Sequence, residues 1–161
     1  KRQGEEFGLL GAQAWVKAHK DKLPKIANLF NRDGGPEPPV GISVPQAMYD
    51  DFVKISEPIQ KIRPDYPFEV KVREPRKRPT RMGGTDASVF AIEGVPTLGF
   101  TTEDFKGYDF DYGEIWHTER DLYTKNIPEY QEHTATVTAI IALGVANLDK
   151  QLSREGLYTE E

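Results

Sequence analysis

Helix-like and strand-like segments alternate along this chain, and that alternation limits the folds open to it. Residues 26–30 and 95–100 are short apolar runs, typical of buried strands, and residues 68–73 alternate apolar and charged side chains. Apolar residues at helical spacing occupy residues 9–20 and the segment after Pro45. Helices that alternate with short strands indicate a layered α/β fold.

The remaining segments complete this expectation. We expect a kink or interruption at Pro58 in the helix after Pro45. Three further segments follow from turn and helix signals, namely a loop at 34–41, a short helix at 86–92 and a long loop at 101–115. A last helix should begin at Pro128 and run to about residue 153. Sites in open α/β sheets form just beyond strand ends, and Asp33 directly follows the strand expected at 26–30.

Composition limits the kinds of function and site that this chain can have. The chain has 161 residues, 37% of them apolar and 29% charged, which fits one soluble domain. The net charge of −5 gives no reason to expect a nucleic acid as partner. Cysteine is absent, so the site has no thiolate. The apolar-rich segment 135–148 is too short to span a membrane, and the first residues do not resemble a signal peptide.

Two adjacent acids, Glu5 and Glu6, stand before a glycine-rich helix entry. Successive side chains leave the backbone in different directions, so one glutamate could bind a metal while the other handles a proton. Taken alone, such a pair is also compatible with a solvated surface.

Later motifs supply further candidates. His117 stands between Trp116 and Thr118, and Asp121 follows four residues later. A carboxylate beside a ligand histidine can fix its tautomer. A histidine of this kind can equally be structural, as Asp33 can cap a turn. Thr85 and Asp86 form a pair that is also common at helix N-caps. One histidine with several carboxylates suits a catalytic zinc ion that keeps an open position.

Taken in order, four motifs resemble the second half of the co-catalytic di-zinc exopeptidases, the family of leucyl aminopeptidases and carboxypeptidase Q. They are GEEFGLLGAQAW, NRDGGPEPPVGI, GGTDASVFAIEGVP and EIWHTERD, at residues 4–15, 31–42, 83–96 and 114–121. The resemblance implies a three-layer αβα fold with a mostly parallel central sheet. Residues 1–161 would form the C-terminal part of a single catalytic domain.

The resemblance also implies roles. Glu5 would be the general base, and Thr85 would help to stabilise the oxyanion. Glu6 and His117 would bind one zinc ion and Asp33 a second, and the two ions would activate the attacking water. Asp86 and Asp121 would support these ligands from behind. The substrate would be a peptide or dipeptide, with a side-chain pocket formed by Tyr108, Phe110, Tyr112 and Trp116 unless these rings are ordinary packing.

The chain departs from the family at its start. The family has a histidine and a metal-bridging aspartate upstream of the paired glutamates, and only four residues precede Glu5 here. We therefore expect the C-terminal part of a longer enzyme, inactive by itself, which could associate with itself or with the missing N-terminal part. Many relatives are secreted or periplasmic, and the resemblance extends that suggestion to this chain.

Other functions stay open at this point. A non-catalytic interaction domain could keep the fold, although it would have no need for Glu5, Glu6, Asp33 and His117 together. The Trp-His-Thr sequence around His117 also resembles the single-zinc glutaminyl cyclases. The basic loop at 73–81 is either solvated or able to receive the carboxylate of a dipeptidase or carboxypeptidase substrate.

Overall fold

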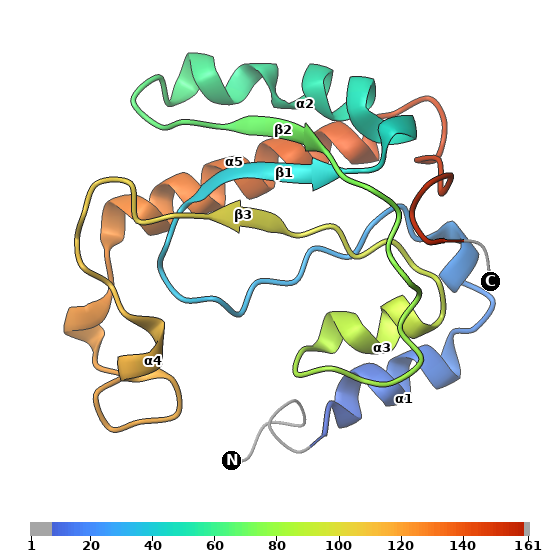
Figure 1. Cartoon of the computed structure of the whole chain (residues 1–161), viewed down its shortest axis with the longest axis horizontal. Coiled ribbons are helices and arrows are strands. Elements are labelled where there is room, and N and C mark those ends of the chain that lie inside the picture. Colours follow the sequence, from blue (N-terminus) through green and yellow to red (C-terminus); the bar gives the residue numbers. More distant parts are fainter. Residues whose placement is uncertain (1–7, 160–161) are drawn as a thin grey trace.

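The computed structural model describes residues 8–159. Figure 1 shows a small sheet with helices packed around it. The strands are β1 (Pro39–Val44), β2 (Glu69–Val72) and β3 (Phe100–Thr102). The helices are α1 (Leu10–Ala18), α2 (Tyr49–Ile62), α3 (Asp86–Ile92), α4 (Tyr112–Ile115) and α5 (Pro128–Ala146), with 3₁₀ turns at η1 (Leu23–Lys25), η2 (Gln46–Met48) and η3 (Tyr123–Lys125). None of these described helices is long and apolar enough to cross a bilayer.

The sheet is mixed, with the order β2-β1-β3. β1 pairs with β2 in parallel, where Ile42 lies opposite Val70. β1 pairs with β3 in the antiparallel sense, where Ile42 lies opposite Phe100. These strands confirm the expected α/β class. They do not establish the mostly parallel, three-layer arrangement, since one of the two pairings is antiparallel.

The main core lies between the sheet and two helices, α2 and α5, which pack against each other. Phe52, Ile59, Val137 and Ile141 are all fully buried there, next to Val44 of β1. Burying a side chain of this kind contributes about 1.5–3 kcal/mol. This cluster therefore holds the sheet to the α2–α5 pair.

A second apolar cluster lies between α1 and α3 (Figure 1). Val16 of α1 is buried there with Val89 and Phe90 of α3 and with Val95, which follows α3. The Trp15 and Phe90 rings lie 5.5 Å apart and add to the same contact. This cluster fixes the entrance of α1 relative to the Gly83–Thr85 turn that precedes α3.

Two strand predictions are corrected by the structure. Residues 26–30 do not form a strand. One backbone bond, from the Leu29 N–H to the Pro96 carbonyl over 2.9 Å, joins this segment to its neighbour, and the Asn28 side chain bonds to both the N–H and the C=O of Leu98. The strand expected at 95–100 is also wrong for most of its length: residues 95–99 form no strand, and β3 begins only at Phe100 and ends at Thr102. β1 was missed altogether and lies partly in the predicted loop at 34–41, because its flanking prolines read as loop signals.

The helix predictions were more accurate than the strand predictions. α1, α2 and α3 lie where expected, and α2 continues through Pro58 because Ile55 and Ile59 on either side are buried in the core. α5 begins at Pro128 as predicted but ends at Ala146, well before residue 153. Asn147 closes it with an N–H bond of 3.0 Å to the Leu143 carbonyl.

Candidate active site

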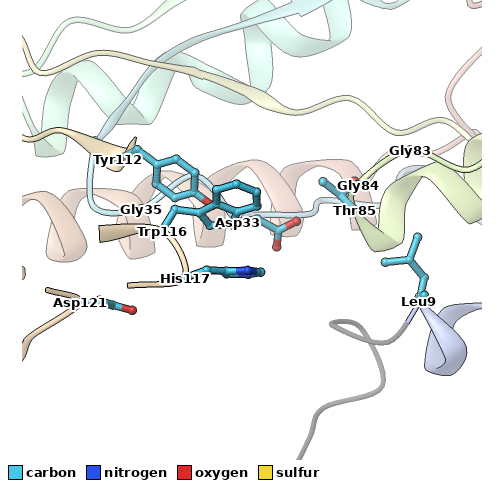
Figure 2. A pocket seen from close by; sticks show the side chains of 11 residues that line it. Leu9, Asp33, Gly35, Gly83, Gly84, Thr85, Tyr112, Trp116, His117 and Asp121 are labelled. Carbon is cyan, nitrogen blue, oxygen red and sulfur yellow. The ribbon is translucent and has the colours of Figure 1, made fainter. Parts of the chain in front are cut away.

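One cavity of about 710 Å³ brings together residues from motifs that lie far apart in the sequence. It is lined by Gly8, Leu9, Asp33, Gly35, Gly83, Gly84, Thr85, Tyr112, Trp116, His117 and Asp121. Figure 2 shows the Asp33 carboxylate and the His117 ring extending toward one open space, with Thr85 on its far side. Glu5 and Glu6 lie outside the described residues. The residues that follow them, Gly8 and Leu9, form part of the cavity wall.

The Asp33 loop is held by short local hydrogen bonds. Asn31 Nδ2 donates to Asp33 Oδ2 over 2.6 Å. Arg32 Nη2 donates to the Gly35 carbonyl over 2.7 Å and also to the Glu37 carbonyl. Partial burial lowers the pKa of the Arg32 guanidinium, while the nearby Glu37 and Asp33 carboxylates act to raise it. The Arg32 cation thus holds the loop through hydrogen bonds directly beside Asp33, the candidate metal ligand.

His117 has an unusual backbone conformation. Its φ is +56°, in the left-handed region that residues other than glycine rarely adopt. It lies just past α4, whose start is capped by Asp111 through a 2.8 Å bond from the Gly113 N–H. Past the helix, the Thr118 N–H returns to the Ile115 carbonyl over 3.0 Å. Strained backbone of this kind is concentrated at functional sites, where surrounding contacts hold it.

Thr85 and Asp86 differ in their surroundings. Thr85 lines the cavity from the N-cap position of α3, yet its side chain makes no cap hydrogen bond. The first turn of α3 is tied instead by Ser88, whose Oγ donates to the Thr85 carbonyl over 2.7 Å. Asp86 does not line the cavity. Its Oδ1 is buried and has no hydrogen-bond partner within the described part of the chain.

The four aromatic residues proposed for a substrate pocket divide into two pairs. Tyr112 and Trp116 line the cavity, and their rings stack 6.4 Å apart. Tyr108 and Phe110 are not among the lining residues. The Tyr108 hydroxyl donates to Glu129 at the start of α5, and Phe110 packs over Gly35.

Sequence reasoning missed a second, adjoining cavity of about 600 Å³. It shares Asp33, Gly35 and Asp121 with the first cavity, and its remaining wall is Arg32, Pro36, Asn126, Gln131, Thr134 and Ala135. Glycines at 34 and 35 and the prolines after them marked the loop. No sequence signal placed α5 beside it.

The donors in the main cavity are oxygen and nitrogen ligands that zinc accepts, namely the carboxylates of Asp33 and Asp121 and the imidazole of His117. Within residues 8–159, however, no three His, Cys, Asp or Glu side chains lie close enough together to hold a metal ion. The described residues therefore fit part of a zinc ligand set. Completing it needs further donors at the same cavity.

Comparison with known proteins agrees with this geometry. The sequence matches the model of peptidase family M28 over residues 2–141. The crystal structure of a peptidase M28 precursor from Shewanella amazonensis SB2B is similar, with a TM-score of 0.67 and 25% identity. That similarity covers 92% of this chain and 31% of the other, so the chain spans about a third of that protein's length. No curated protein matches the sequence.

These matches confirm the resemblance to the zinc exopeptidases, because M28 is a zinc exopeptidase family that includes aminopeptidases and enzymes of the carboxypeptidase Q type. The family match extends through all four motifs. The chain belongs to peptidase family M28.

Proposed function

We propose that this chain carries part of the active site of a zinc-dependent exopeptidase of the aminopeptidase type. The observation that supports this most directly is the meeting of Asp33, Thr85 and His117, from three separate motifs, at one cavity. Gly8 and Leu9, which follow the paired glutamates in sequence, line the same cavity. A solvated surface would not need these residues to converge.

In this proposal, Glu6 and His117 hold one zinc ion and Asp33 holds a second. Bound zinc would polarise the scissile carbonyl and lower the pKa of the attacking water. Asp121, which lines the same cavity as His117, would orient the imidazole by accepting its other ring N–H. The upstream histidine and aspartate of the family would complete the ligand set.

The organic part of the reaction falls to this chain's own groups. Glu5 would take a proton from the attacking water and return it to the leaving amine. The Thr85 hydroxyl, which α3 does not use as a cap, would donate to the oxygen of the tetrahedral intermediate. Tyr112 and Trp116 would line the subsite for an apolar substrate side chain.

The absence of lysine and arginine from the described part of the cavity wall favours an aminopeptidase over a carboxypeptidase. The basic loop at 73–81, which could receive a terminal carboxylate, does not line the cavity. Asp33 and Asp121 do not bear on this choice, because in this proposal Asp33 binds zinc and Asp121 orients His117, and bound zinc would reverse the local charge. The substrate would therefore present its free amino terminus, as a peptide or a dipeptide.

A substitution of Glu5 tests this assignment. In the natural polypeptide that contains this sequence, Glu5→Gln should keep the bound zinc and lower kcat by about 10²–10⁴-fold, the usual contribution of a general base. Glu119→Gln, at an exposed acid that does not line the cavity, is the matched control and should keep full turnover. Zinc content and hydrolysis of aminoacyl substrates are measured for both. Unchanged turnover in Glu5→Gln would remove Glu5 from the proposed role.

A further inference from the structure

Two loops of the active-site cavity touch at Gly35. A β-carbon placed on Gly35 would lie 2.9 Å from Phe110 Cζ and 3.2 Å from Tyr112 Cδ2. The first distance is shorter than any normal carbon–carbon contact, and both atoms belong to rigid rings. Gly35 also has a φ of +74°, which glycine adopts without cost. The two rings therefore occupy the space that any other residue would need.

Each of these loops carries a proposed zinc ligand. Asp33 stands two residues before Gly35 and is joined to the same turn by the Asn31 and Arg32 hydrogen bonds. On the other side, ring contacts lead from Tyr112 to Trp116 over 6.4 Å and from Trp116 to His117 over 4.5 Å. A continuous series of contacts thus links the Asp33 loop to His117 through Gly35.

The loop that carries Tyr108, Phe110 and Tyr112, here called the aromatic loop, is also fixed at its other end. The Tyr108 hydroxyl donates to Glu129, and the Tyr130 hydroxyl donates to Asp104 over 2.7 Å. The Lys106 N–H donates to the same Tyr130 hydroxyl over 3.0 Å. Because this end is hydrogen-bonded to α5, the loop cannot move away from Gly35 as a unit and take Phe110 and Tyr112 with it. A β-carbon added at residue 35 must instead change the spacing between the loop that carries Asp33 and the loop that carries His117.

We propose that Gly35 is a positioning residue that sets the separation between Asp33 and His117. It acts through Phe110 and Tyr112 and needs no contact with the substrate. The consequence for zinc rests on the proposed function, whereas the consequence for the aromatic loop follows from packing alone. The two can therefore be measured separately.

The test compares Gly35→Ala with Gly34→Ala. The control is closely matched, because a β-carbon on Gly34 would meet only Arg32 Nη1, at 3.4 Å, without the left-handed backbone of Gly35. The chain has two tryptophans, so the indole N–H peaks of Trp116 and Trp15 report in one NMR spectrum. We expect Gly35→Ala to move the Trp116 peak and to leave the Trp15 peak in place. Gly34→Ala should leave both peaks unchanged.

Zinc affinity is the second readout, measured by competition with a chelator in the natural polypeptide that contains this sequence. Displacing a ligand's supporting contacts typically weakens metal binding about 10–100-fold, and we expect that loss for Gly35→Ala only. Adding Phe110→Leu to Gly35→Ala separates the closer ring contact from backbone strain, because the shorter side chain removes the contact with Phe110 and leaves φ and the 3.2 Å contact with Tyr112 unchanged. Return of the Trp116 peak and of zinc affinity toward the values of Phe110→Leu alone supports the contact.

The outcomes distinguish the two proposals. If Gly35→Ala matches Gly34→Ala in the Trp116 peak, the positioning role is wrong. If Phe110→Leu restores nothing, the part assigned to Phe110 is wrong. If the unaltered natural polypeptide binds no zinc, the proposed function fails, and the Trp116 peak still decides whether Gly35 positions the loop.

Discussion

His133 offers a quantitative test of how the α5–β1 contact is built. Its side chain is fully buried and stacks on Tyr66 at 4.0 Å, with Nε2 3.0 Å from the Pro39 carbonyl at the start of β1. Because a carbonyl only accepts, Nε2 must carry the proton, and Nδ1 is then a bare acceptor. Nδ1 is buried and has no hydrogen-bond partner in the described part of the chain.

The perturbation is His133→Phe, which keeps an aromatic ring over Tyr66. Losing the Nε2 donor leaves the Pro39 carbonyl unsatisfied, at a cost of about 1–3 kcal/mol. Removing the unsatisfied Nδ1 recovers a similar amount, about 1–3 kcal/mol. The two terms offset each other, so at pH 8 the free energies of unfolding of the variant and the unaltered protein should agree within about 1 kcal/mol.

Acid should separate the two proteins. Burial lowers the pKa of His133 and outweighs the hydrogen bond to the Pro39 carbonyl, which acts to raise it. The nearby Arg63 charge adds a smaller lowering of the same pKa. The folded-state pKa thus lies below the unfolded value of about 6.5, and the unfolded state binds more protons as the pH falls. Stability present above about pH 6.5 is lost toward the lowered pKa, by up to about 1.4 kcal/mol per pH unit.

Urea unfolding at pH 8.0, 6.5 and 5.5, followed by circular dichroism, measures this difference. His133→Phe should gain on the unaltered protein by up to about 1.4 kcal/mol between pH 8.0 and 5.5, of which about 1 kcal/mol falls between pH 6.5 and 5.5. Parallel pH curves for the two proteins would refute the reasoning, because they would show that His133 takes up no extra proton on unfolding.

Two further predictions concern the sheet and the segment beside it. Gly41→Ala should lower the free energy of unfolding by about 1–3 kcal/mol, because the new β-carbon would lie 2.4 Å from the Glu69 carbonyl oxygen on β2. Gly99→Ala, with nothing within 4 Å, should change it by less than about 1 kcal/mol, and equal effects in urea unfolding would contradict the packing argument. Asn28→Ala should cost about 1–3 kcal/mol by removing both hydrogen bonds to Leu98, and an unchanged urea midpoint would show that these bonds do not hold the segment.

Short sequence patterns predicted the helices, whose backbone hydrogen bonds join residues close together in the sequence. α1, α2 and α3 were predicted from apolar spacing and from breakers such as Gly94, which has a φ of +78° just after α3. Which segments pair to form the sheet was not predictable in the same way. Residues 26–30 look like a strand, yet whether they form a ladder depends on which groups lie beside them. One backbone bond, from Leu29 to Pro96, and the Asn28 side chain stand where a ladder was expected.

The candidate site shows the same division. The family resemblance of the four motifs predicted that Asp33, Thr85 and His117 would belong to one site, and all three line one cavity. The path of the loop at 101–115 was not encoded in any short pattern. Tyr108, proposed for the pocket, instead bonds to Glu129, because that loop folds back onto the start of α5.

The most direct test of the proposed zinc site is the zinc affinity of three proteins, measured by calorimetric titration: the natural polypeptide that contains this sequence, and its His117→Ala and His19→Ala variants. His19 is the matched control, since it stacks on Trp15 of α1 and does not line the cavity. We predict zinc binding to the unaltered polypeptide that is unchanged in His19→Ala and weakened more than about tenfold in His117→Ala, because a lost ligand should cost at least as much as the lost support of one. Equal zinc affinity in all three proteins would contradict the assignment of His117 to a zinc site.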